Sequence, residues 1–413
     1  MSDQIQEGVF FRPGETPPAH FAIAFLKSKP GATALQIDQV LTQLFLVYRE
    51  LKQGRVPDLP GQSVMSGNLS VLLGFGARLF SVPELSKNIP EPLKDNGSFR
   101  NPSGGNAILL GAGLHYSPSV SENPANADIV LQFHANTALA VHRGVVETWK
   151  VLHDLEKTTG LAPLYITGSY TGFGRDDHRS WIDFHDGISN IKSEDRIQAI
   201  EIKDRGLDHR DAWTQKGTYM LFLRIPINLA LWRSVSRAMQ EVLVGRDKLT
   251  GCSITDIDPS GEPISHSGCP VTGAMTVVEE RNESFREASR SKIRKPKLLA
   301  SHIHRANHGD GNIGSPNSRR IFRQGYEFFE GVDPEGKPRL GLNFVSFQDH
   351  PERVTFMLKQ PGWLGDTNFG GDPNSLPPNF EKLLEVEAAG TFLVPPRDDA
   401  LRFPGATLFD VAK

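Results

Sequence analysis

The same order of predicted elements occurs twice along this chain, and this repeat constrains the fold more than any other feature. In the first copy, apolar side chains recur at helical spacing between Ala34 and Lys52, and short apolar runs typical of strands lie on either side. The order is β-α-β-β-α-β, the split βαβ arrangement. Its predicted elements are a strand His20–Leu26, a helix Ala34–Lys52, strands Asn68–Gly76 and Asp128–Ala135, a helix His142–Glu156 and a strand Leu164–Phe173.

The second half of the chain repeats this order. Its predicted elements are a strand Thr218–Ile227, a helix Asn228–Leu243, strands Ser318–Phe329 and Pro338–Gln348, a helix Glu352–Gln360 and a strand Thr391–Pro396. We therefore predict an α+β fold of two ferredoxin-like halves with antiparallel sheets. We expect an N-terminal domain of residues 1–195 and a C-terminal domain of residues 196–413.

Charge and cysteine content limit the classes of partner and compartment. The chain has 45 Lys plus Arg against 48 Asp plus Glu, a net charge of −3, so nothing attracts it to nucleic acid or anionic membranes in general. No apolar run approaches the ~20 residues that a membrane span needs, and no secretory signal is visible at the N-terminus. The two cysteines, Cys252 and Cys269, predict free thiols in a reducing compartment. We expect a cytoplasmic protein.

A cluster of histidines lies inside a stretch without clear periodicity, between Gly245 and Pro316. His302, His304 and His308 lie with Asp310 in nine residues. Histidine is the commonest metal ligand, and a haem iron takes one neutral histidine on its proximal side. On an extended chain His302 and His304 would face one way and could hold zinc or non-haem iron with His308 or Asp310. Surface histidines beside a turn would show the same spacing, which does not separate these interpretations.

Two further segments carry residues suited to proton transfer and charge stabilisation. Asp186-Gly187 comes shortly after the last strand of the first half. Asp-Gly is a common turn, but a positioned carboxylate can also move a proton, and Gly187 would let a flat ligand approach the backbone. Arg323 lies 323 − 302 = 21 residues after His302 in a predicted strand. In the next strand Leu342 and Phe344 share one face, as plain core packing also predicts.

These segments resemble those of the dye-decolourising peroxidases, and the similarity extends over most of the chain. The histidine segment SHIHRANH is similar to the family's A-H-I-R-x-x-N-P, with His304 and His308 in place of Arg and Pro. The loop DFHDGIS resembles G-x-x-D-G-I-S, with Asp183 in place of the first glycine, which leaves a second carboxylate near Asp186. The strand SRRIFRQGY resembles R-R-x-L-R-R-G-Y, with Gln324 in place of the second arginine of the pair.

The resemblance implies a haem peroxidase with haem b (iron protoporphyrin IX) in the C-terminal half. His302 would be the iron's proximal ligand, Asp186 would move the peroxide proton, and Arg323 would stabilise negative charge. The family's distal pocket walls would fall on Leu342 and Phe344, and Gly187 would lie against the porphyrin.

Arg305 could make the haem contact that the family's arginine makes at the position of His304. A carboxylate normally accepts the other N–H of a proximal histidine, and the sequence does not choose between Glu385 and Glu387.

The expected reaction reduces hydrogen peroxide and oxidises small organic donors, such as dyes and phenolics, by one-electron steps. Two alternatives stay open: a haem-handling or iron-release protein of the same fold, and a non-haem metal protein built on residues 302–310. The natural donor and homo-oligomerisation also stay open.

Overall fold

The computed structural model describes residues 4–9, 11, 17–94, 116–121, 126–188, 190–191, 193–203, 209–265, 293–306, 319–358 and 373–410. The N-terminal half contains β1 (His20–Ser28), α1 (Ala34–Lys52), β2 (Ser70–Gly76), α2 (Glu91–Lys94), β3 (Tyr116–Ser121), β4 (Ile129–Ala135), α3 (Ala138–Thr159) and β5 (Leu164–Phe173). The C-terminal half contains α4 (Ser193–Ile200), β6 (Thr218–Pro226), α5 (Leu229–Arg233), α6 (Arg237–Val244), β7 (Ile254–Ile257), β8 (Pro263–Ser265), α7 (Pro296–Leu299), α8 (His302–Ala306), β9 (Phe322–Val332), β10 (Pro338–Gln348), α9 (Glu352–Leu358) and β11 (Val386–Val394).

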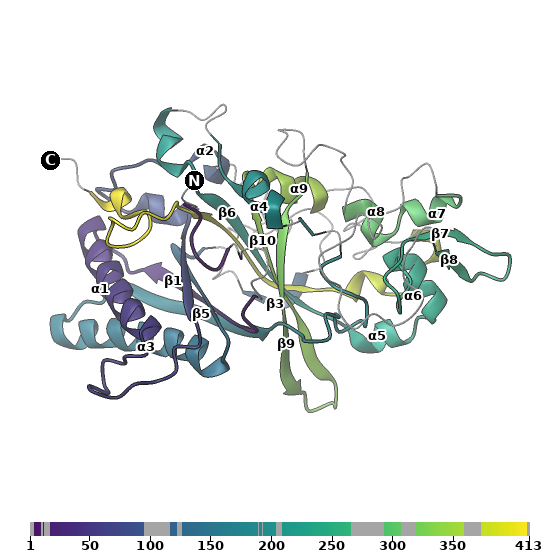
Figure 1. Ribbon diagram of the computed structural model, residues 1–413, viewed down its shortest axis with the longest axis horizontal. Coiled ribbons are helices and arrows are strands. Elements are labelled where there is room, and N and C mark those ends of the chain that lie inside the picture. The colour runs from purple at the N-terminus through teal and green to yellow at the C-terminus, as the bar shows by residue number, and fades with distance from the viewer. Residues whose placement is uncertain are drawn as a thin grey trace.

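Each half forms a four-stranded antiparallel sheet with the strand order expected of a ferredoxin-like unit. The N-terminal sheet runs β2-β4-β1-β5 and the C-terminal sheet runs β9-β10-β6-β11, so both halves have the order second, third, first, fourth. The predicted fold class is thus confirmed. The halves join at two edges, where β5 pairs with β9 at Phe173 and Glu327 and β11 pairs with β2. Within the described residues the eight strands therefore close into one barrel-like layer (Figure 1).

The inside of this layer is filled by apolar side chains from both halves. One buried cluster combines residues of β1, β2 and β4 with residues of β6, β9, β10 and β11, and it includes Phe21, Phe25, Phe222, Tyr326 and Phe347. Because side chains alternate along a strand, the neighbouring residues of β9 and β10 point to the outer face of the sheet. That outer face is the surface on which the candidate site is built.

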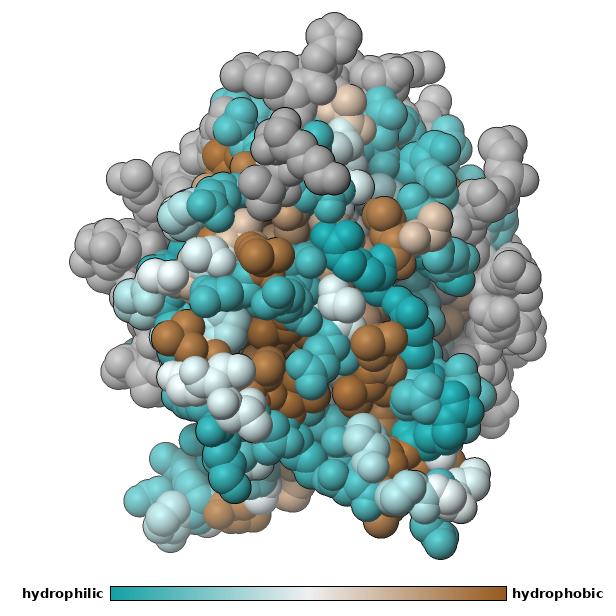
Figure 2. Space-filling model, turned by 90° about the vertical axis from the view of Figure 1, so that its left-hand side faces the viewer, coloured by the Kyte–Doolittle hydropathy of each residue, from teal (hydrophilic) through white to brown (hydrophobic). Residues whose placement is uncertain are grey.

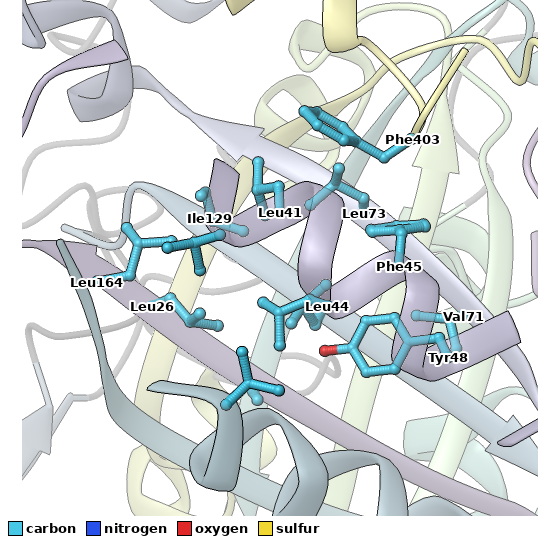
Figure 3. Close-up of a cluster of buried hydrophobic side chains, with 14 of the residues drawn as sticks. Leu26, Leu41, Leu44, Phe45, Tyr48, Val71, Leu73, Ile129, Leu164 and Phe403 are labelled. Carbon is cyan, nitrogen blue, oxygen red and sulfur yellow. The ribbon is translucent and has the colours of Figure 1, made fainter. Parts of the chain in front are cut away.

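The outer face of the N-terminal sheet is covered by two helices. Thr33 and Gln36 form a capping box at the start of α1, and Gly160 ends α3 in the left-handed conformation that a helix C-terminus favours. The buried side of α1 packs on β2, β4 and β1 (Figure 3). The hydroxyls of Tyr48 and Thr148 join the two helices at 2.6 Å. The outward sides of α1 and α3 expose apolar side chains among polar ones (Figure 2), among them Leu46 and Trp149.

The end of the chain returns to the N-terminal half. Phe403, Leu408 and Phe409 belong to the same buried cluster as α1. The boundary between residues 195 and 196 stays a prediction. Among the described residues, no helix combines the length and the apolar character needed to cross a bilayer.

Two predictions, about a helix and about the cysteines, were wrong. The single helix predicted over Asn228–Leu243 is divided into α5 and α6, because Ser234 donates its hydroxyl to Leu231 O (2.7 Å) and Ser236 caps the start of α6 through Met239 N (3.3 Å). The prediction of free thiols was also wrong, because Cys252 is disulfide-bonded and no described cysteine is free. Cys269, the chain's other cysteine, lies outside the described residues.

Candidate active site

The Asp186 loop follows β5 and is held in place by backbone hydrogen bonds. Asp186 N donates to His178 O at 2.9 Å, and the Asp186 carboxylate accepts from Gly187 N at 2.7 Å. Gly187 has a φ of 77°, which glycine adopts at no steric cost. The Trp181 indole donates to Phe328 O of β9 at 3.1 Å, so the start of the loop is fixed to the C-terminal sheet. The carboxylate of Asp186 is exposed at the surface of this loop.

The backbone conformation of Asp183 explains why the family's pattern has a glycine at this position. Its φ is 67°, in the left-handed region where aspartate is tolerated better than most side chains. Its carboxylate is two-thirds exposed and lies 3.5 Å from Lys248 Nζ. The second carboxylate of the loop is thus paired with a lysine at the surface, whereas Asp186 lies against β9.

The structure brings Asp186 together with residues of β9 and β10. Gly325 is paired with Phe344, and a Cβ at Gly325 would lie 3.3 Å from Asp186 Oδ2 and 3.2 Å from Leu342 Cδ1. Leu342 and Phe344 are both half-buried on this outer face. The missing side chain of Gly325 therefore leaves the room in which the Asp186 carboxylate approaches the sheet.

Arg323 is on the same face, two residues before Gly325, and is tied to the end of the Asp186 loop. Its backbone exchanges hydrogen bonds with the Asn190 side chain, which accepts from Arg323 N at 3.1 Å and donates to Arg323 O at 2.8 Å. Its guanidinium donates to Ile188 O at 3.3 Å. Asp186, Arg323, Leu342 and Phe344 thus form one group, built by a loop of the first half and two strands of the second.

The histidine segment is helical. The premise of a shared metal site, an extended chain, was wrong. His302 begins α8 and is half-buried, whereas His304 is buried. Residues two apart on a helix point to nearly opposite sides, while residues three apart lie on one side. Arg305 is therefore on the His302 side of α8, and His304 is not. His308 and Asp310 lie outside the described residues, and the part that is described holds no cluster of three metal-ligating side chains.

One turn supports both α8 and the Asp186 loop. Gly245, which ends α6, packs so closely on α8 that a Cβ there would lie 2.5 Å from Ser301 Oγ. Six residues later, a Cβ at Gly251 would lie 2.6 Å from Ile188 Cδ1 in the Asp186 loop. Arg246 closes the turn by donating to Gly251 O at 2.9 Å. The next residue, Cys252, is disulfide-bonded. The disulfide therefore restrains this turn close to its contacts with α8 and with the Asp186 loop.

Comparison with known proteins identifies the family. The family model described as Dyp-type peroxidase, C-terminal, matches residues 177–399, more than half of the chain. The chain belongs to the Dyp-type peroxidase family. This stretch includes Asp186, His302 and Arg323, the residues on which the resemblance was first based.

Relatives and solved structures agree with this family. The Dyp-type chain is 24% identical over 321 residues to the deferrochelatases of Shigella flexneri serotype 5b and Escherichia coli K12, a match that covers 74% of this chain and 64% of each relative. The chain thus spans less than two thirds of the length of these curated relatives. Ferric DtpA from Streptomyces lividans superposes with a TM-score of 0.69 at 20% identity over 98% of this chain and 95% of that one. A DyP-type peroxidase from Streptomyces coelicolor gives 0.68 at 21% identity, over 98% and 95%.

Glu327 is a residue of the candidate site that the motifs did not indicate. It is only 5% exposed, lies on the same face of β9 as Arg323 and Gly325, and is opposite Leu342. Burial and the negative charge of Asp186 raise the pKa of Glu327 to about 8, against a smaller opposing effect of Arg175. No sequence signal distinguished this glutamate from the exposed acids that often occupy strand ends.

The two candidate acid partners of the proximal histidine differ in their surroundings. Glu387 lies 3.4 Å from Arg224 Nε and 3.7 Å from Arg339, so its carboxylate is already engaged by two arginines. Glu385 is half-buried just before β11, where its backbone N donates to Pro226 O at 3.3 Å. Glu387 is thus paired with arginines and Glu385 has no ion pair among the described residues, and the choice between them stays a prediction.

Proposed function

We propose that this chain is a haem peroxidase that reduces hydrogen peroxide and oxidises organic donors by one-electron steps. The observation that carries the proposal is the position of the Asp186 carboxylate over Gly325, in one group with Arg323, Leu342 and Phe344. A proton-transfer group, a fixed cation and an apolar wall are the parts that peroxide cleavage requires.

The residues present fit a flat, apolar iron porphyrin. Among the described residues, nothing lies within 4 Å of the position that a Cβ would occupy at Gly187, so its backbone can be approached closely. Leu342 and Phe344 offer an apolar wall, and His302 offers an imidazole on a helix supported by the same turn as the Asp186 loop. Haem b would be held by His302, Gly187, Arg305, Leu342 and Phe344. A structural neighbour from Rhodococcus jostii RHA1, a DypB variant in complex with heme, has a TM-score of 0.59 at 16% identity over 97% of this chain and 98% of that one.

The roles of the protein's own groups follow from their chemistry. Bound haem would supply an iron that binds peroxide and accepts two oxidising equivalents from it. Asp186 would take the proton from the inner peroxide oxygen and return it to the outer one, which makes the outer oxygen a better leaving group. The guanidinium of Arg323 would stabilise the negative charge that develops on that oxygen. Gly325 keeps the space that lets Asp186 reach this position.

A second candidate function is release of iron from haem, because the curated relatives are named deferrochelatases. It would use the same pocket. Incubation with haem and peroxide separates the two: an oxidised donor with intact haem supports the peroxidase, and iron-free porphyrin supports the alternative.

Steady-state oxidation of an anthraquinone dye by the haem-loaded protein tests the proposal. Asp186→Asn keeps the shape of the side chain but is a poor proton acceptor, and we expect a loss of 100-fold or more in kcat, on the order of that for removing a general acid–base group. Asp183→Asn is the matched control in the same loop, and we expect parent-like activity because Asp183 faces Lys248. Equal activity of Asp186→Asn and the parent would contradict the proposal.

The substrates and the cellular compartment of the protein are also proposals. Hydrogen peroxide and small organic donors suit a site whose apolar walls, Leu342 and Phe344, are half-buried. The cytoplasmic location predicted from free thiols loses that support, since the disulfide at Cys252 is more typical of oxidising compartments. Self-association of the chain stays a prediction.

A further inference from the structure

Glu327 occupies the point where the two sheets join. It is paired with Phe173 of β5 across the short contact between the halves and with Leu342 of β10 on its other side. Its side chain shares the outer face of β9 with Gly325, against which Asp186 Oδ2 lies. The residue thus belongs to the candidate site by position, although the mechanism above does not use it.

The carboxyl group of Glu327 has few hydrogen-bond partners for a buried acid. Trp181 donates its backbone N–H to it, and Oε2 has no hydrogen-bond partner in the described part of the chain. Buried charges are normally paired, because removal of an ion from water is costly. The one nearby cation, among the charged groups that the structure describes around Glu327, is Arg175, and its guanidinium is bound to Asp177 at 2.8 Å and lies over the Trp181 ring at 4.8 Å.

The charged groups around Glu327 favour its neutral form. Asp186 and Asp177 are the acids that face it from the loop, and Arg175 is the base. Leu342 and Phe173, its neighbours on β10 and β5, do not titrate. Burial is the largest effect and Asp186 the next, and together they raise the pKa to about 8. A buried carboxyl with no ion pair among the described residues, beside the negative charge of Asp186, resembles two acids that share one charge.

We propose that Glu327 is a further acid of this site, which keeps its proton beside the ionised Asp186 so that the pocket carries one negative charge instead of two. The inference rests on the proposed function. A neutral Glu327 leaves Asp186 as the one group of the pair that can accept the peroxide proton. When Glu327 ionises, the pocket gains a second negative charge that weakens the attraction of anionic hydroperoxide to Arg323. Glu327 would therefore act as a positioning residue that sets the alkaline limit of the site.

The first test is thermal unfolding of the full-length protein between pH 4.5 and 9, without reference to activity. Because the folded pKa of Glu327 is raised, its contribution to stability is fully present below the unfolded value of about 4.5 and is lost as pH rises toward about 8. Relative to Glu327→Gln, the unfolding constant of the parent should therefore rise by roughly tenfold per pH unit in this window. Glu335→Gln, an exposed acid of the β9–β10 loop, is the matched control and should show no such trend.

The second test is the pH profile of peroxide turnover. We expect parent activity to fall above about pH 8 and the activity of Glu327→Gln to persist to higher pH. If Glu327→Gln does not fold, Asp186→Asn serves in the unfolding measurement, because loss of the Asp186 charge should move the Glu327 transition to lower pH. Profiles of Glu327→Gln that match the parent in both measurements would overturn the inference. A parent protein with no turnover at all would overturn the proposed function instead, and the unfolding data would still decide the state of Glu327.

Discussion

At the residue scale, the candidate site depends on Gly325, whose lack of a side chain leaves room for the Asp186 carboxylate. A Cβ at Gly325 would meet both Asp186 Oδ2 and Leu342 Cδ1. The motifs assigned Asp186 and Arg323 to one function, but they did not show that Gly325 leaves the room in which the Asp186 carboxylate approaches the sheet.

Gly325→Ala should therefore impair catalysis more than folding. The new methyl would lie 3.3 Å from Asp186 Oδ2 and 3.2 Å from Leu342 Cδ1, so both side chains must shift by a few tenths of an ångström. Crowding of this kind costs about 1–3 kcal/mol of stability, and a displaced general base lowers kcat further. Gly168→Ala is the control, since a Cβ at Gly168 on β5 meets no described residue within 4 Å. If Gly325→Ala matches Gly168→Ala in kcat and Tm, the placement of Asp186 is wrong.

At the element scale, prediction from sequence succeeded where the pattern is local. The bounds of α1, β5 and β10 were predicted to the residue, because a capping box at Thr33 and continuous periodicity define them without distant contacts. It failed where side chains compete with the backbone, as Ser234 and Ser236 do between α5 and α6. It also failed for α8, whose five residues are too few to show a helical period.

The turn between Gly245 and Cys252 should control how well α8 is held. Gly245 has a φ of 87°, and a Cβ there would lie 2.5 Å from Ser301 Oγ, so Gly245→Ala combines backbone strain with a steric clash. We expect a loss of about 2–4 kcal/mol in the free energy of unfolding and weaker haem retention. Denaturant unfolding and haem transfer to apomyoglobin measure the two effects. Gly261→Ala, also at positive φ but with nothing within 4 Å, controls for strain alone. Equal losses in the two variants would show that contact with α8 does not matter.

At the scale of the whole molecule, the site is a product of the way the halves join. Glu327 could not be recognised from its strand, because its burial comes from β5 and from Trp181, about 150 residues earlier in the chain. A second buried titratable group, His134, lies inside the barrel. His134 of β4 is fully buried and stacks on Tyr326 of β9 at 5.1 Å, and burial lowers its pKa to about 3.

His134 should make the fold sensitive to acid. Since its folded pKa is depressed, the stability it allows is present above the unfolded value of about 6.5 and is lost as pH falls below it, by ~1.4 kcal/mol per pH unit. His134→Phe cannot be protonated and should flatten the decline of Tm between pH 6.5 and 4, whatever its effect at neutral pH. His153→Gln, at an exposed position on α3, should decline as the parent does. An unchanged slope in His134→Phe would contradict a buried neutral imidazole.

The account as a whole depends on an imidazole of α8 that binds an iron porphyrin beside the Asp186 loop. Its most direct test is a titration of purified protein with haem, followed by the Soret absorption band. We predict one haem per chain in the parent and in His304→Ala, and a band that is lost or shifted in His302→Ala. Haem binding of equal strength and spectrum in His302→Ala and the parent would contradict the account.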